Sequence, residues 1–567
     1  MFRSGRIAIA SLALAGCSSD ANLPAGTLGF GGMGGGRLGG FGGTSGTGGT
    51  AGTGGPGGTA GTGGTGGTGN VPVAPTGAAV FRGRLPKLLN SGPICTFEEG
   101  ATGDRWCGFF ADTTTTPISV ELFVVNVTKA AAGVPITCGL PDSNCLKLTS
   151  ASFQDPSHPE MFQGDTLIYY DATGTPFGWR PGMSEGRPLA VADPKTMDLS
   201  LCYAAIKGTA VVCLRVLPAA MQTIQSVLQA DLLAGRLDGA ANPPLARIET
   251  VIATSLTDRN ISRYRAGYPI PGGDLVAWSA RAVPGGPEVL KTQTLGDDAS
   301  RATVASDANR WRTSADGSHW YWFSEVDDET RAGTLHTAPF PGGAGPAAVT
   351  ANALQFDFPT PTSLITVAST GELRVFPNLA GAPGNGAILA RGVFRMLVLG
   401  AQGYVAYNKA VMSADAAQLS DLYVTRADGT GACTLTAATD GYPAGVRFTP
   451  SATGSTWIQQ RGSGYTAHYT RLADCATMDV ASAVARAEPF GDRGVLYVND
   501  YSPGAQIGSL WFRALAAGGA VSGAPATRVS GEVGGFTVVS SGGGDAVIYA
   551  VESGRSDDGV YVRGFGP

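Results

Sequence analysis

Beyond about residue 260 the chain repeats a pair of short apolar runs joined by a polar turn. The first runs are nearly continuous in apolar, β-branched and aromatic residues, and the second runs alternate more. The first runs read DLVAWSA, HWYWFSE, SLITVAS, YVAYNKA, STWIQQR, VLYVNDY and AVIYAVE, and the second read EVLKTQT, GTLHTAP, GELRVFP, SDLYVTR, YTAHYTR, GSLWFRA and DGVYVRG. Runs of this length and composition predict paired β-strands.

The spacing of these pairs indicates the fold. The second runs align on Val289, Leu335, Leu373, Leu422, Ala467, Leu510 and Val560, at intervals of 46, 38, 49, 45, 43 and 50 residues. A β unit that recurs every 40 to 50 residues is typical of a β-propeller with four-stranded blades. We therefore predict an all-β propeller of about seven or eight blades, with its repeats in residues 261–567.

Residues 77–260 also read as β-rich. Their candidate strands are WCGFFAD, VELFVVNVT, DTLIYYDA and CYAAIKGTAVVCLRV, and ADLLAGRLDG from Ala230 resembles a second run with its Asp238-Gly239 turn. The stretch AAMQTIQSVLQADLLAG also fits a helical period, so a helix is the alternative there. This part supplies either the first blades of one seven- or eight-bladed ring or a cap domain in front of a seven-bladed ring. The chain offers ten candidate blades, which exceed the usual four to eight, so we expect some to be insertions or the chain to form two domains.

Several turns resemble the TolB-type propeller repeats of bacterial envelope proteins. That family carries a Trp-Ser-Pro-Asp-Gly turn before an apolar strand and an Asp-Gly turn after it. Here Trp311-Arg312-Thr313-Ser314-Ala315-Asp316-Gly317 keeps the tryptophan and the Asp-Gly, and Phe448-Thr449-Pro450-Ser451 keeps part of the same turn. The segment DLYVTRADGTGACTLT carries the later turn at Asp428-Gly429. The other repeats depart from this pattern.

The N-terminus has the layout of a secretory signal peptide. Arg3 and Arg6 precede a short apolar run that ends in Leu14-Ala15-Gly16-Cys17. Those four residues resemble the lipobox of bacterial lipoproteins, which implies that residues 1–17 form the signal and that Cys17 is acylated, palmitate included. By the same resemblance, Ser18 favours the outer membrane or cell surface of a Gram-negative cell. A plain signal peptide with an incidental cysteine is the alternative.

Residues 18–76 are predicted to be a disordered tether. Of the 85 glycines, 25 fall between Gly26 and Gly69, and from Ser18 to Pro75 the charged residues are Asp20 and Arg37. Such a segment has little apolar surface to bury and a high entropic cost of ordering. As a flexible coil it spans roughly 40 Å. Its composition is similar to the spacers of myxobacterial surface lipoproteins.

Net charge and cysteine content further limit the classes of protein to which this chain can belong. The formal net charge of −5 gives no basic stripe for nucleic acid. Eight cysteines besides Cys17 indicate disulfides in an exported chain, and the Cys-x-x-Cys spacing of zinc sites is absent. Short intervening turns favour nearest-neighbour pairing, namely Cys95 with Cys107, Cys138 with Cys145, Cys202 with Cys213, and Cys433 with Cys475.

The sequence motifs of α/β-hydrolase catalysis and of phosphate binding are absent, and histidine or paired-carboxylate catalysis has no positive sign in the sequence. The sequence has neither the Gly-x-Ser-x-Gly of α/β hydrolases nor a phosphate-binding Gly-x-x-x-x-Gly-Lys. The acidic turn from Glu325 to Glu329 is a weak candidate for calcium, with a solvated hairpin turn as the alternative. The aromatic residues Trp320-Tyr321-Trp322 fit packing between blades better than a sugar-stacking platform.

The polar residues that end the first runs are the best candidates for a binding face. They differ from repeat to repeat, and loops at the faces of a propeller carry its binding chemistry. These residues are Glu325, Lys409, Arg461, Asp500 and Glu552. We expect a lipid-anchored envelope or surface protein whose propeller is a non-catalytic scaffold for a protein or glycan. The alternatives are a propeller hydrolase or lyase acting on extracellular polysaccharide or peptide, and a structural or sensory protein.

Overall fold

The computed structural model describes residues 75–564 with gaps. The gaps are 83–93, 96–103, 114–118, 139–143, 149–160, 164, 172–174, 190–198, 205–207, 217–227, 239–244, 254–273, 282–285, 315–316, 328, 341–344, 378–385, 400–402, 413–417, 441–445, 451–453, 462–463, 491–492, 503–506, 517–524 and 542–543. Cys17 and most of the predicted tether fall outside these residues. The helix of the described part is not long and apolar enough to cross a membrane.

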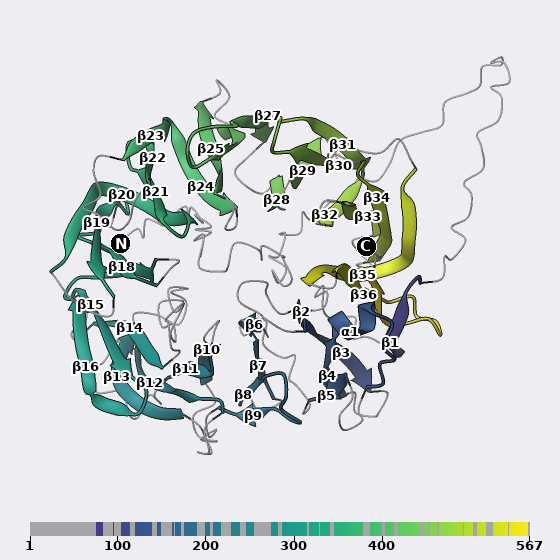
Figure 1. Cartoon of the computed structure of the whole chain (residues 1–567), viewed down its shortest axis with the longest axis horizontal. Coiled ribbons are helices and arrows are strands. Elements are labelled where there is room, and N and C mark those ends of the chain that lie inside the picture. The colour runs from purple at the N-terminus through teal and green to yellow at the C-terminus, as the bar shows by residue number, and fades with distance from the viewer. Residues whose placement is uncertain are drawn as a thin grey trace, which may run out of the picture.

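The described strands form an all-β ring, which confirms the predicted fold class (Figure 1). They make seven antiparallel sheets, four of four strands and three of seven. Each seven-stranded sheet contains two four-stranded units that share their middle strand. The shared strand (β13, β20 or β35) is the outermost strand of one unit and the first strand of the next. Counted in this way the ring has ten units, which we number as blades 1 to 10. The predicted seven or eight blades thus match the number of sheets rather than the number of units.

The blades follow one another in chain order, and where a blade begins with a strand of its own, such as β6, β24 or β28, that strand lies toward the centre (Figure 1). Blades 1 to 3 comprise β2 (Ile94–Cys95), β3 (Trp106–Thr113), β4 (Ser119–Asn126), β5 (Cys145–Lys147); β6 (Met161–Gln163), β7 (Thr166–Tyr170), β8 (Pro176–Trp179), β9 (Arg187–Pro188); β10 (Leu199–Ala204), β11 (Ala210–Val216), β12 (Leu228–Arg236) and β13 (Leu245–Ala253). Residues 77–260 therefore contribute strands to the ring itself, and the helical alternative is wrong for 228–236.

Blades 4 to 10 hold the seven repeated strand pairs found in the sequence. Blades 4 to 7 add β14 (Leu275–Arg281), β15 (Glu288–Thr294), β16 (Asp297–Ala305); β17 (Asn309–Thr313), β18 (His319–Ser324), β19 (Gly333–Pro339), β20 (Ala347–Thr360); β21 (Ser363–Ala368), β22 (Leu373–Phe376), β23 (Ala387–Ala390); β24 (Val393–Leu399), β25 (Tyr404–Met412), β26 (Gln418–Arg426) and β27 (Cys433–Asp440). Blades 8 to 10 add β28 (Val446–Pro450), β29 (Gly454–Arg461), β30 (Gly464–Arg471), β31 (Thr477–Ser482); β32 (Val484–Phe490), β33 (Gly494–Ser502), β34 (Ile507–Ala514), β35 (Thr527–Ser541); β36 (Gly544–Val551), β37 (Gly559–Gly564) and β1 (Ala78–Arg82).

Burial explains why the first runs are so apolar. They form the second strand of each blade, and the sheets of the neighbouring blades cover both faces of that strand. In β18 every residue after His319 is buried, whereas the outermost strand β16 is mostly exposed. Trp320, Tyr321 and Trp322 are at most 2% exposed, so the packing interpretation of this aromatic stretch is confirmed.

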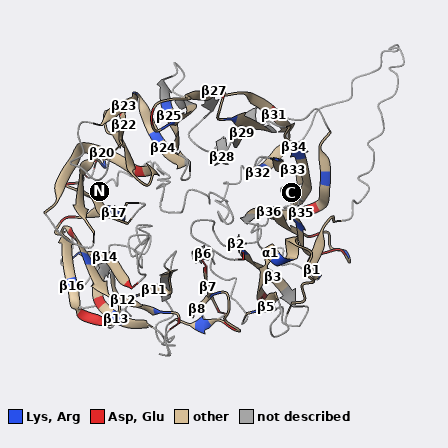
Figure 2. Cartoon of the chain, in the orientation of Figure 1, with Lys and Arg blue, Asp and Glu red and all other residues tan. Residues whose placement is uncertain are grey.

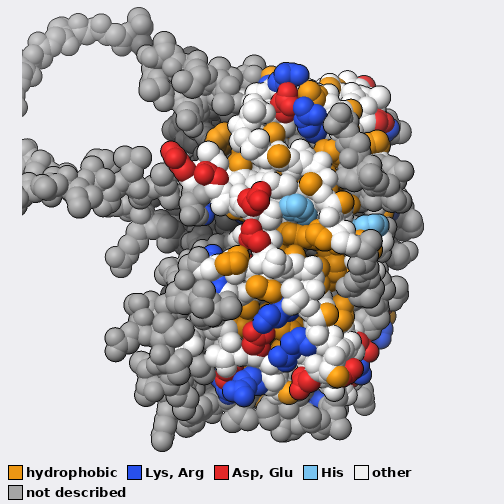
Figure 3. All heavy atoms as spheres, turned by 90° about the vertical axis from the view of Figure 1, so that its left-hand side faces the viewer, with side chains coloured by type: hydrophobic (Ala, Val, Ile, Leu, Met, Phe, Trp, Pro, Cys, Tyr) orange, Lys and Arg blue, Asp and Glu red, His pale blue; other side chains and the backbone are white. Residues whose placement is uncertain are grey.

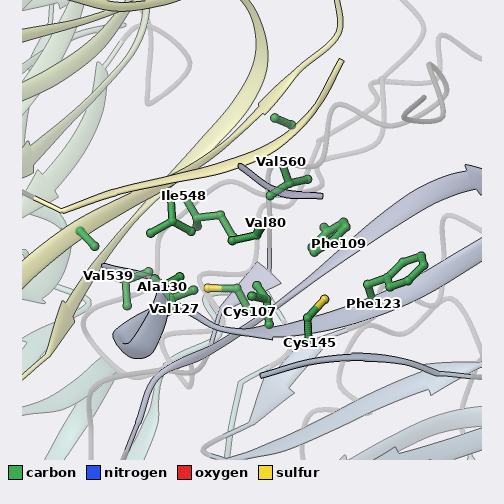
Figure 4. Close-up of a cluster of buried hydrophobic side chains, with 14 of the residues drawn as sticks. Val80, Cys107, Phe109, Phe123, Val127, Ala130, Cys145, Val539, Ile548 and Val560 are labelled. Atoms are coloured by element: carbon green, nitrogen blue, oxygen red, sulfur yellow. The ribbon is translucent and has the colours of Figure 1, made fainter. Parts of the chain in front are cut away.

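The ring closes through a strand from each end of the described chain. Strand β1 pairs antiparallel with β37 and so completes blade 10. The one helix of the described residues, α1 (Val127–Ala131), packs Val127 and Ala130 against Ile548 and other apolar residues of blade 10 (Figure 4). Just before β1, Thr76 donates through its hydroxyl to the Val529 carbonyl at 2.8 Å, and its carbonyl accepts from the Tyr549 hydroxyl.

Three of the predicted disulfides are present. Cys138 bonds Cys145, and Cys202 bonds Cys213 across β10 and β11. Cys433 of blade 7 bonds Cys475 in a turn of blade 8, so this bond links two neighbouring blades. Cys107 is also disulfide-bonded, and Cys95 is its partner in the register of β2 and β3, which fits the predicted pairing. The side chain of Cys95 is outside the described residues.

Candidate functional site

One face of the ring carries both the turns that follow the second strands and the crossings between blades. Antiparallel strands reverse direction at each turn, so the second and fourth strands of a blade end on the same face. The chain passes from each fourth strand to the next blade on that face. We call it the crossing face.

The five polar residues predicted as a binding face all lie at the crossing face. Glu325 and Glu552 directly follow β18 and β36, Lys409 and Asp500 lie near the ends of β25 and β33, and Arg461 is the last residue of β29. They belong to five different blades, so they share a face rather than one compact cluster. The side chain of Arg461 lies outside the described residues.

Two of these positions, Glu325 and Glu552, contact a crossing directly. The backbone N–H of Glu552 donates to the Glu532 carbonyl at 2.9 Å, and the N–H of Ser369 donates to the Asn352 carbonyl at 2.8 Å in the same way. Glu532 and Asn352 both have a φ of 55°, a left-handed conformation that turns the chain from one blade into the next. In blade 5 the Asp307 carboxylate takes the place of that carbonyl and accepts from the N–H of Glu325 at 2.8 Å.

A β-bulge follows the crossing in five blades. In blade 7, Val393 pairs with Lys409 and Arg395 pairs with Asn408, which leaves Phe394 as an extra residue. The same one-residue shift occurs at the start of the first strands of blades 5, 6, 9 and 10. Bulges redirect side chains and often lie beside functional sites. We call the extra residues at these positions the bulge rim.

The residues of the bulge rim differ in size, charge and exposure. They are Arg310, Leu354, Phe394, Ala485 and Gly534 in blades 5, 6, 7, 9 and 10. Neighbouring members make contact, because the Arg310 guanidinium donates to the Leu354 carbonyl at 3.0 Å. Gly534 leaves room for the Glu552 carboxylate, which would lie 2.3 Å from an added Cβ. The rim thus includes a cation, apolar residues and a position occupied by a carboxylate.

Phe394 is the most prominent member of the rim. The residue is 57% exposed, the largest value among the exposed large hydrophobic residues of the described part of the chain. Lys409 lies beside it, as the register partner of Val393, and its ammonium group is 4.7 Å from the centre of the Tyr423 ring. An exposed aromatic ring next to a cation is a favourable combination for binding.

Two further cations, Arg374 and Arg391, lie near the crossing from blade 6 to blade 7. Glu372 accepts from Arg374 at 2.6 Å and from Arg391 at 3.0 Å. The hydrogen bond from Arg374, aided by the positive charges of both arginines, lowers the pKa of Glu372. The Arg391 side chain remains 73% exposed. Figure 2 shows basic positions on β24 and β25, and Figure 3 shows basic side chains together at the upper end of its view.

Ion pairs hold the first strands of neighbouring blades together. Arg312 of β17 donates to Asp357 of β20 at 2.8 Å, and these side chains are only 14% and 12% exposed. In blade 9, Arg486 donates to Glu488, which also accepts from the N–H of Val538 in the next blade at 3.4 Å. Sequence reasoning missed these pairs, although charges in an otherwise apolar strand, as in Arg486-Ala-Glu488, were a signal. They fix the inner edge of the ring.

The acidic turn and His336 lie in blade 5 and make local contacts there. Glu325 and Asp327 of the acidic turn are exposed, and the hydrogen bond from the backbone of Thr330 lowers the pKa of Asp327. Among the described residues, no group of three or more His, Cys, Asp or Glu is placed to hold a metal ion. His336 accepts or donates a hydrogen bond with the Ser324 hydroxyl at 2.8 Å and stacks on Trp322.

Comparisons with known proteins find solved structures that are similar to part of this chain. No family model matches the chain, and no curated protein matches it. A eukaryotic initiation factor structure is 11% identical, with a TM-score of 0.44 over 76% of this chain and 97% of that one. A prolyl endopeptidase is 10% identical, with a TM-score of 0.36 over 70% and 54%. The β-propeller domain of the trilobed protease from Pyrococcus furiosus is 9% identical, with a TM-score of 0.29 over 59% and 95%.

Proposed function

We propose that this protein is a lipid-anchored envelope or cell-surface lipoprotein whose propeller binds a protein or glycan without catalysis. The observation that carries the binding role is the bulge rim. The same backbone device recurs on five blades while the residue that it presents changes from blade to blade. A constant frame with varied contact residues is what a binding scaffold requires.

The rigidity of this frame supports the proposal. Closure by β1 and the ion pairs between first strands hold neighbouring blades in fixed positions. A rim that is ordered before binding loses less entropy when a partner docks, so more of the contact energy appears as affinity.

The proposed lipid anchor rests on the resemblance of residues Leu14 to Cys17 to a lipobox. Replacing Cys17 with Ala should move the protein from the membrane fraction to the soluble fraction, and retention in the membrane would contradict the anchor.

The binding role can be tested with two matched double variants. The first, Arg310→Ala with Phe394→Ala, removes two exposed side chains of the bulge rim. The control, Val134→Ala with Arg426→Ala, removes an exposed apolar residue and an exposed cation at the opposite face. Binding of the purified full chain to envelope fractions from cells that lack it is then measured at increasing concentration.

We expect saturable binding that weakens at least about tenfold in the rim variant and changes less than about twofold in the control. Equal effects of both variants would contradict binding at the crossing face. Reproducible turnover of polysaccharides or aminoacyl substrates by the full chain would instead favour the propeller hydrolase or lyase.

A further inference from the structure

Blade 7 presents a different kind of residue from the rest of the bulge rim. Its extra residue is a phenylalanine that is more than half exposed, whereas Leu354 and Ala485 are partly buried at the same position. Exposing an aromatic ring to water is unfavourable, and burial of such a ring in an interface is a typical binding hot spot. Within the bulge rim, blade 7 therefore offers an apolar contact that the other blades do not.

The charges around Phe394 indicate the chemistry of its partner. Lys409 is the register partner of Val393, next to Phe394, and Arg391 lies three residues before Phe394. Arg374 of β22 shares the carboxylate of Glu372 with Arg391. Three positive charges and one negative charge leave these described side chains with a net charge of +2. Its partner should therefore be acidic.

We propose that the rim of blade 7 binds an acidic polypeptide segment that carries aromatic side chains. This deepens the proposed binding function and rests on it. Carboxylates satisfy the cations, but only an apolar or aromatic group can bury the Phe394 ring. A ring beside arginines is the composition that is enriched at the centres of protein interfaces. An acidic glycan would engage the cations and leave the phenylalanine in water.

The local structure prepares the site for such a segment. Glu372 holds both Arg374 and Arg391, so their side chains are positioned before binding. The Gln355 side chain donates to the Met396 carbonyl at 2.9 Å and ties the bulged strand to blade 6. These contacts reduce the entropy that binding would cost.

The test measures binding of three labelled polymers to the purified full chain by fluorescence anisotropy. A random copolymer of glutamate and tyrosine supplies acidic and aromatic groups, polyglutamate supplies acidic groups alone, and polygalacturonate is an acidic glycan. We expect the copolymer to bind roughly tenfold more tightly than the other two. Phe394→Ala should remove that difference, and Val134→Ala, another exposed apolar residue, should not. Lys409→Ala should weaken binding of the copolymer and reduce its dependence on salt.

Three results would overturn the proposal. They are equal binding of the copolymer and polyglutamate, copolymer binding that survives Phe394→Ala, and tighter binding of polygalacturonate than of either polypeptide. The last of these would assign the site to a glycan. Envelope binding that is lost in the Arg310→Ala, Phe394→Ala double variant but kept in Phe394→Ala alone would refute this inference and leave the proposed function standing. A near-ultraviolet circular dichroism spectrum of each variant confirms that the ring is folded.

Discussion

Closure of the ring by β1 can be tested with a single charged side chain. Val80 is 4% exposed and belongs to the apolar cluster that joins blades 1 and 10, whereas Ala78 in the same strand is exposed. Val80→Asp places a carboxylate in that cluster, where an unpaired charge costs several kcal/mol. Ala78→Asp adds the same charge to the exposed side of the strand and serves as its control.

The loss of stability caused by Val80→Asp cannot exceed the free energy with which β1 is bound to the ring. The strand buries Val80 and packs Phe81 on Phe109 and Phe123, with ring centres 5.6 and 5.2 Å apart. Two such side chains contribute about 1.5 to 3 kcal/mol each, or about 3 to 6 kcal/mol together. If the buried charge costs more than this, β1 leaves the sheet instead. The free energy of unfolding should therefore fall by at most about 6 kcal/mol.

Guanidinium unfolding followed by tryptophan fluorescence measures the change, and hydrogen exchange at β37 shows where it arises. We expect a lower midpoint for Val80→Asp, with faster exchange in β37 because its pairing with β1 is lost. Ala78→Asp should change the free energy by less than about 0.5 kcal/mol. Equal midpoints for the two variants, or unchanged exchange in β37, would refute closure by this strand.

Two further predictions concern the links between blades. Cys433→Ser with Cys475→Ser opens a bond between residues 42 apart in sequence and should lower the unfolding free energy by about 4 kcal/mol, against about 3 kcal/mol for the Cys202 and Cys213 pair, separated by 11. Denaturant titration measures both, and a larger loss from the shorter loop would contradict the entropic reasoning. Burial raises the pKa of Tyr549, so the folded state holds this proton more tightly than the unfolded state does. Its contribution to stability is complete below about pH 10 and is lost as the pH rises further. Tyr549→Phe should therefore lose less stability between pH 8 and pH 11 than the unmodified protein, and an equal loss would show that this tyrosine does not control the alkaline transition.

The sequence predicted the strands that are buried on both faces and missed those whose partners are distant. All seven repeated pairs are correct, because two-sided burial makes the second strand of a blade continuously apolar, as in β18. The role of β1 had no local signal, since Ala78 pairs with Val562 near the other end of the described chain. The ten candidate blades of the sequence equal the number of four-stranded units, and the prediction of seven or eight came from the usual range of four to eight blades.

The candidate site was predictable only in part. The residues that end the first runs share one face of the ring, because turns of a meander alternate between faces, and their role in binding stays a prediction. The bulges were invisible, since an extra residue such as Phe394 in VFRMLVL reads as one more core position. Which cation meets which carboxylate depends on the neighbouring blade, as with Arg312 and Asp357, and sequence spacing does not encode that contact.

The position of Thr76 has a mechanical consequence. Strand β37 runs away from the crossing face, so its antiparallel partner β1 runs toward it, and Thr76 at the start of β1 lies on the side of the opposite face. In a chain anchored at Cys17, as proposed, a partner on the bulge rim and the membrane would pull from opposite faces of the ring. The load would enter through the bonds of Thr76 to Val529 and Tyr549 and pass along the pairing of β1 with β37 as shear. The strand that completes the ring would then also be the part that limits how much tension the attachment can bear.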